Sequence, residues 1–126
     1  MDDVAAFATH LADEAGVIAR QYFRTGIAID TKSDDTPVTR ADREIEARLR
    51  ALVAEHRPED GIVGEEYGNQ PSKSGYTWVF DPIDGTKSFT IGRPTFGTLI
   101  GLCKNDVPVL GVIDQPILKE RWLGLH

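Results

Sequence analysis

The sequence predicts an α+β fold in which two long helices pack on one face of a mainly antiparallel sheet. Two segments in the first half repeat apolar residues every three to four positions, a spacing that is typical of amphipathic helices. In the second half, short runs of β-branched and aromatic residues are separated by turn residues, a pattern that is typical of strands. At 126 residues the chain is long enough for one domain with a core, so we predict a single lobe over residues 1–126.

The first helix is predicted over Asp3–Thr25. An aspartate at position 2 or 3 can cap its start, and Gly26 is suited to end it. Its apolar positions form one stripe: Val4, Ala8, Leu11, Ala15, Ile18 and Tyr22. The alternating run Ile27–Thr31 that follows predicts a strand, and Lys32 comes directly after it, before a polar turn.

The second helix is predicted over Thr39–His56, beginning at Val38 or Thr39. Its apolar positions also share one face: Ala41, Ile45, Leu49 and Leu52. Asp42 falls in the first turn of this predicted helix, where acidic residues usually complement the helix dipole. A short buried strand is then expected over Gly61–Gly64, directly before two glutamates.

The later strands are bounded by proline, glycine, asparagine and aspartate. We expect the sheet to contain Ile27–Thr31, Tyr76–Phe80, Thr95–Lys104 and Val107–Asp114, with Glu120–Leu125 as a further strand at the end. The pair Asn105-Asp106 predicts the turn of a hairpin. Because Pro82 cannot donate a ladder hydrogen bond, the strand Tyr76–Phe80 should stop where the acidic residues begin.

Charge and composition exclude some classes of partner. A net charge of −6 argues against binding to nucleic acid or to an anionic membrane. The single cysteine, Cys103, cannot form an internal disulfide and is expected to pack as a small apolar residue. Met1 is followed by two aspartates, and no apolar stretch approaches the roughly 20 residues that span a bilayer, so we expect a cytoplasmic protein.

The segment after Phe80 predicts a site. Asp81 and Asp84 can converge on one point if the chain turns, and the proline and glycine beside them favour a turn. Carboxylates without a nearby histidine or cysteine favour a hard cation such as Mg²⁺. Thr86 stands at the start of a predicted short helix, where free N–H groups attract an anion. A metal site beside an anion site points to phosphate chemistry, although Asp-x-x-Asp-Gly alone could also be a plain surface turn.

The whole segment from Trp78 onward is a more specific signal than the two aspartates and the glycine alone. Trp78, the sequence Asp-Pro-Ile-Asp-Gly-Thr over residues 81–86, and an aromatic residue after it resemble the signature of the inositol monophosphatase-like family of Mg²⁺-dependent phosphatases. The run from Pro37 to Asp42 is similar to the Val-Thr-x-x-Asp element of that family. Gly64 with the two glutamates that follow it resembles the Gly-Glu-Glu element of the family.

The resemblance implies a set of site residues. Glu65, Asp81, the carbonyl of Ile83, and Asp84 would hold Mg²⁺, or Mn²⁺ in its place. In this scheme Asp42 and Thr86 lie beside the metal and orient and deprotonate the attacking water, without any covalent intermediate. The N–H groups of Gly85 and Thr86 would hold the phosphate of the substrate. The resemblance also directs Lys32 towards the metal site, whereas by default it is a solvated lysine.

The resemblance covers only the first half of the usual family protein. It implies that residues 1–126 are the N-terminal lobe of a layered αβαβα sandwich, the sugar-phosphatase fold, whose C-terminal lobe supplies another metal-binding aspartate. We therefore expect this chain alone to be a poor catalyst, by roughly 10²–10⁴ in rate. A lobe taken from such a sandwich should leave an apolar sheet face uncovered, so we expect association into a homodimer.

The segment Gly111–Trp122 resembles the histidinol-phosphate phosphatase branch of the family more than the inositol branch. This similarity implies a phosphomonoesterase acting on histidinol phosphate in histidine biosynthesis. Inositol 1-phosphate or a related sugar phosphate is the alternative substrate.

Three other readings of the motif stay open. Phosphatases of the haloacid dehalogenase type use Asp-x-Asp-Gly-Thr with an aspartate nucleophile, but the spacing here is Asp-x-x-Asp. A calcium-binding loop counted from Asp81 would reach Gly92 at its twelfth position, where a glutamate is needed. The third reading is that the chain is a catalytically weak lobe that binds a metal or mediates oligomerisation.

Overall fold

The computed structural model describes residues 2–25 and 37–126. Its elements follow one another as α1 (Asp2–Tyr22), α2 (Pro37–His56), β1 (Gly61–Val63), β2 (Tyr76–Asp84), α3 (Thr86–Thr90), β3 (Gly97–Lys104), β4 (Val107–Gln115) and β5 (Glu120–Leu125). The predicted strand Ile27–Thr31 and Lys32 lie outside the described residues. The α+β fold predicted from the sequence is confirmed.

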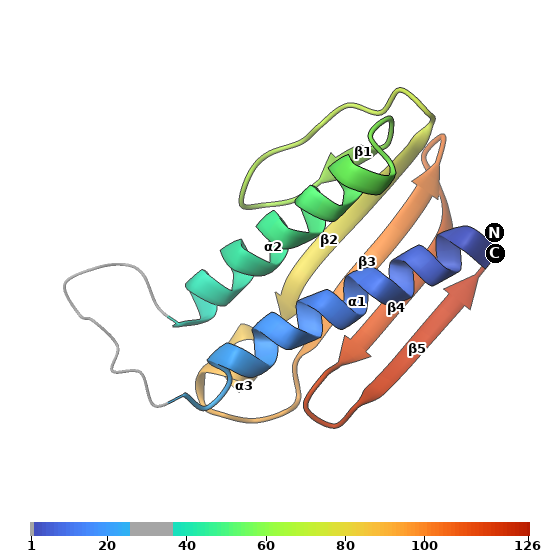
Figure 1. Cartoon of the computed structure of the whole chain (residues 1–126). Helices are drawn as coiled ribbons and strands as arrows, with labels where there is room; N and C mark the ends of the chain where they lie inside the picture. Colours follow the sequence, from blue (N-terminus) through green and yellow to red (C-terminus); the bar gives the residue numbers. More distant parts are fainter. Residues whose placement is uncertain (1, 26–36) are drawn as a thin grey trace.

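One sheet of five strands, in the order β1-β2-β3-β4-β5, forms the centre of the fold. The pair β1 and β2 is parallel, and the three other neighbouring pairs are antiparallel. Figure 1 shows α1 and α2 lying side by side across one face of this sheet and running in opposite directions. The predicted mainly antiparallel sheet with both long helices on one face is therefore confirmed.

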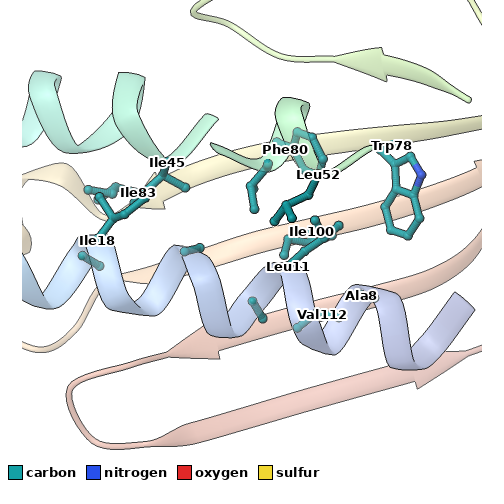
Figure 2. Close-up of a cluster of buried hydrophobic side chains, with 14 of the residues drawn as sticks. Ala8, Leu11, Ile18, Ile45, Leu52, Trp78, Phe80, Ile83, Ile100 and Val112 are labelled. Carbon is teal, nitrogen blue, oxygen red and sulfur yellow. The ribbon is translucent and has the colours of Figure 1, made fainter. Parts of the chain in front are cut away.

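The core lies between the two helices and the sheet, as Figure 2 shows. The apolar stripes predicted for the helices are buried there, except that Tyr22 is half-buried. From the sheet side, Trp78, Phe80, Ile100 and Val112 point into the same cluster and are each less than 5% exposed. The periodicity of the sequence thus identified the buried faces of both long helices correctly.

The ends of both long helices differ from the prediction. The first helix ends at Tyr22 instead of Thr25. Arg24 already has a φ of 54°, and the Thr25 hydroxyl donates to the Tyr22 carbonyl at 3.2 Å, which satisfies one of the last helical acceptors. The second helix begins at Pro37, earlier than the predicted Val38 or Thr39, because proline has no N–H to lose in a first turn.

The strand that carries the motif is longer than predicted. It runs through Asp84 instead of stopping at Phe80. Asp81 pairs with Leu99 and Asp84 with Gly97, so β2 holds one extra residue opposite β3 between these two pairs. This irregularity places Pro82 where the ladder does not need its missing N–H, and the strand continues. The next strand, β3, starts at Gly97 instead of Thr95.

The other face of the sheet is apolar and open to solvent in the described part of the chain. Val79, Ile113 and Trp122 are 40%, 51% and 57% exposed on it. In this face, Gly101, Gly111 and Gly124 pair across neighbouring strands. The helices in the described ranges include none long and apolar enough to cross a membrane.

Candidate active site

The motif aspartates lie at the end of β2, where the strand bulges. Pro82 and Ile83 are buried, with Ile83 only 3% exposed, and Asp81 and Asp84 on either side of them are exposed. The buried hydroxyl of Thr98 on β3 donates to the Pro82 carbonyl at 2.8 Å. The bulge is therefore fixed from inside, and both carboxylates are presented to solvent at the end of the strand.

Gly85 turns the chain from β2 into α3. Its φ of 89° is left-handed, and an added Cβ would lie 2.9 Å from the Thr95 carbonyl oxygen. Glycine is required here both for its conformation and for the close approach of the backbone. The predicted helix start at Thr86 is confirmed. Phe89 anchors this short helix in an aromatic cluster with Phe23 and Phe96, at ring distances of 5.6 and 4.9 Å.

The two predicted glutamates follow β1. Glu65 is exposed and Glu66 is half-buried. The N–H of Glu66 donates to the side chain of Glu46 on α2 at 3.3 Å, and the N–H of Tyr67 donates to the same carboxylate at 3.0 Å. The turn that carries the glutamates is thus tied to the second helix.

Asp42 lies on α2 beside these acidic groups. Because the helix begins at Pro37, no acidic residue occupies its first turn, so the expected placement of Asp42 in that turn was wrong. Burial and the negative charges of Glu66, Asp81 and Glu65 raise the pKa of Asp42 to about 7, and a hydrogen bond from the Ile83 backbone opposes this shift. Asp42 is therefore an electrostatic neighbour of Glu65, Glu66 and Asp81.

Asp81 is perturbed in the same direction. Although the residue is exposed overall, neighbouring atoms take part of its carboxyl group out of water, which raises its pKa, and the charges of Asp84 and Glu65 add to the effect. Carboxylates from α2, β2 and the turn after β1 thus repel one another around one region. Figure 1 shows why this is so, since β2 ends beside α3 and the start of α2. A cation among them would relieve this repulsion.

The oxygen donors of this region fit Mg²⁺ or Mn²⁺ by their chemistry. In the described ranges, however, no three histidine, cysteine, aspartate or glutamate side chains stand close enough together to hold a metal ion. The neighbouring charges identify the region, and the assignment of Glu65, Asp81, Ile83 and Asp84 as ligands stays a prediction. The roles of Asp42, Gly85 and Thr86 stay predictions too, and Lys32 lies outside the described residues.

Two residues that support the site were missed in the sequence. Thr98 lies in an apolar strand without any local signal of its contact with Pro82. Glu46 did leave a signal, because it follows Asp42 by four residues and precedes Arg50 by four, so all three share one side of α2. That spacing alone does not distinguish Glu46 from a solvated glutamate, and only its full burial in the structure identifies it as a support for the site.

Comparison with known proteins places this geometry in a family. The sequence matches the inositol monophosphatase family over residues 1–126. It is 47% identical to the bifunctional phosphatase IMPL2 of Arabidopsis thaliana, over 100% of this chain and 37% of that protein. It is 44% identical to a histidinol-phosphatase of Mycobacterium tuberculosis, over 95% of this chain and 46% of that protein.

The fold agrees with the sequence comparison. The structure superposes on a solved inositol monophosphatase from Zymomonas mobilis with a TM-score of 0.87 and 49% identity, over 98% of this chain and 47% of that one. The chain thus spans less than half the length of these relatives. The match over all 126 residues, together with the shared fold, shows that this chain belongs to the inositol monophosphatase family.

Proposed function

We propose that the protein to which this chain belongs is a Mg²⁺-dependent phosphatase that hydrolyses a small phosphate monoester. The observation that carries the proposal is the gathering of acidic groups from α2, β2 and the turn after β1 beside the glycine start of α3, where the pKa values of Asp42 and Asp81 are raised. Such an arrangement suits a cation and a phosphate together. Relatives described as phosphatases support the same activity.

In this proposal Glu65, Asp81, the Ile83 carbonyl and Asp84 would hold the metal. Bound there, Mg²⁺ supplies charge neutralisation for the phosphoryl oxygens and the leaving oxygen. The chain's own groups provide the remaining requirements, which are orientation of the water, removal of its proton and placement of the phosphate.

Asp42 is suited to remove the proton. Without a cation, burial and the neighbouring carboxylates raise the pKa of Asp42, and a cation bound beside it would favour the charged form that can accept a proton from water. Thr86 is exposed at the first position of α3 and can orient the water through its hydroxyl. Gly85, whose left-handed backbone precedes α3, and Thr86 would offer their backbone N–H groups to the phosphate.

Histidinol phosphate is the substrate that we favour, with inositol 1-phosphate or a related sugar phosphate as the alternative. Similarity to histidinol-phosphatases of Mycobacterium tuberculosis and Chlorobaculum parvum, at 44% identity each, supports this choice. The similarity of the Gly111–Trp122 segment to that branch points the same way. We also propose that the protein acts in the cytoplasm and as a homodimer through the open sheet face.

A catalytic assay tests the function. Phosphate release from histidinol phosphate and from inositol 1-phosphate should be measured for this chain and for a longer form that reaches the length of the relatives, with Mg²⁺ and with EDTA. We expect the longer form to prefer histidinol phosphate and to need the metal, and this chain alone to be slower by about 10²–10⁴. A preference for inositol 1-phosphate would overturn the substrate but keep the chemistry.

The metal assignment needs a separate measurement. Calorimetric titration should detect binding of a divalent cation that Asp81→Asn removes. Asp106→Asn makes the same chemical change at an exposed turn between β3 and β4 and should leave binding unchanged. If Asp81→Asn binds the ion as tightly as the parent chain, the ligand assignment is wrong, and the alternative of a catalytically weak lobe that binds a metal or mediates oligomerisation becomes the better one.

A further inference from the structure

We propose that Glu46 is a positioning residue whose carboxylate holds the turn Glu65–Tyr67 in place and thereby sets the affinity of the site for its metal. The metal part of this inference rests on the proposed function. The structural part, that Glu46 fixes the turn, does not depend on it.

Glu46 is fully buried, with 0% of the residue exposed. Burial of a charged carboxylate is unfavourable unless hydrogen bonds replace its water. Two of these bonds come from backbone N–H groups in the turn, at 3.3 Å from Glu66 and 3.0 Å from Tyr67. The third comes from Arg50 Nε at 3.0 Å. The turn therefore supplies much of what makes this burial tolerable.

Gly64 shows how closely the turn lies on the carboxylate. An added Cβ at this position would lie 2.5, 2.6 and 2.8 Å from the Oε1, Cδ and Oε2 atoms of Glu46. No real Cβ makes contacts of that length, so any side chain here would have to displace either the carboxylate or the turn. Glycine is needed at this point for space, directly before the predicted ligand Glu65.

Arg50 extends the support to the far end of the turn. Its guanidinium donates both to Glu46 and to the carbonyl of Gly68, and it lies 6.0 Å from the centre of the Tyr67 ring. Glu46 and Arg50 are separated by one helical turn on α2. The two side chains therefore hold the segment from residue 66 to residue 68 against a single helix.

The same helix carries Asp42, one turn before Glu46. Because one rigid element holds both Asp42 and the turn, the distance between the proposed base and Glu65 is set by α2. Glu65 itself is exposed, so its direction depends on the backbone that carries it. Groups that orient metal ligands in this way commonly change metal affinity by about 10- to 100-fold when they are replaced.

Glu46→Gln is the main test. It keeps the shape of the side chain but replaces one acceptor oxygen with an NH₂ group, so one of the two turn N–H groups loses its partner. Asp60→Asn is the matched control, because Asp60 is also a buried carboxylate, 3% exposed, but bonds to Trp78 and Ser74, away from the turn. Glu55→Gln makes the same change at an exposed position of α2.

Two quantities should be measured for each variant. Amide hydrogen exchange at Glu66 and Tyr67 without metal reports on the turn, and the Kd for Mn²⁺, followed by electron paramagnetic resonance, reports on the site. For Glu46→Gln we expect at least tenfold faster exchange at one of these amides and a Kd that is about 10- to 100-fold higher. For Asp60→Asn we expect a lower melting temperature with an unchanged Kd, and for Glu55→Gln no change.

The outcomes separate this inference from the proposed function. Parent-like exchange and a parent-like Kd in Glu46→Gln would overturn the positioning role. A parent chain that does not bind Mn²⁺ at all would refute the proposed function, and the exchange rates alone would then decide whether Glu46 holds the turn. If Glu46→Gln does not fold, Arg50→Gln replaces it, with faster exchange at Tyr67 and a higher Kd expected, and parent-like values overturning the proposal.

Discussion

Replacing Asp42 with asparagine should stabilise the fold at neutral pH when no divalent ion is present. The folded chain holds the Asp42 proton up to a pH of about 7, whereas the ordinary value for aspartate is 3.8. A raised pKa in the folded state means that stability is fully present below the ordinary value and is lost as the pH rises through the folded value. The parent should therefore lose stability between pH 4 and pH 7 from this group, and Asp42→Asn should not.

The expected change in the free energy of unfolding follows from the folded and the ordinary pKa of Asp42. The gap between 3.8 and about 7 corresponds to about 4 kcal/mol at 1.36 kcal/mol per pKa unit. Asp42 is only half-buried, so solvent screens its charge, and we reduce the expected effect to about 1–2 kcal/mol. The Asp42→Asn chain should thus unfold at a higher urea concentration than the parent at pH 8, and the two should be nearly equal at pH 4.

The assay is urea unfolding in EDTA at both pH values, followed by tryptophan fluorescence. Asp106→Asn, an exposed control, should show no such pH-dependent gain. Adding Mg²⁺ at pH 8 should reduce the advantage of Asp42→Asn, because a cation nearby favours the charged form of the parent. If Asp42→Asn is no more stable than the parent at pH 8 in EDTA, the reasoning that burial and neighbouring carboxylates strain Asp42 is refuted.

Three further changes test a buried hydrogen bond of the core and two contacts that support the site. Trp78→Phe removes the indole N–H that donates to buried Asp60 at 2.9 Å. The free energy of unfolding measured in urea should fall by about 1–3 kcal/mol, and an unchanged urea midpoint would contradict this expectation. Gly85→Ala strains a φ of 89°, and we expect a lower melting temperature by calorimetry and slower phosphate release; parent-like values would argue against the required close approach. Thr98→Val removes the 2.8 Å hydrogen bond to the Pro82 carbonyl. We expect the free energy of unfolding in urea to fall by about 1–2 kcal/mol and Mn²⁺ binding to weaken. Unchanged Mn²⁺ affinity would show that the sheet alone holds the bulge.

Much of the fold could be predicted from local patterns. The stripe from Val4 to Ile18 reports directly which side of the first helix faces the core, because its apolar residues recur with the helical period. The aromatic and β-branched residues of Tyr76–Phe80 predicted a strand but not which side of it faces out, and Val79 is 40% exposed. The helix start at Thr86 could be predicted for a similar reason, since Gly85 has the conformational freedom to turn the chain there. These features depend on residues that are near neighbours in the sequence.

The remaining features depend on contacts between distant residues, which only the tertiary structure decides. Pro82 was expected to end its strand, but an extra residue opposite β3 and a hydroxyl from Thr98 let the strand continue. The residues next to Asp42 in the sequence give no sign of its raised pKa. The charged groups that raise it lie more than 20 residues away along the chain. Glu46 would pass for a solvated glutamate on a charged helix until the turn at residues 66 and 67 is folded against it. Burial and electrostatics are set by whatever packs against a side chain, and for these residues that partner comes from another part of the chain.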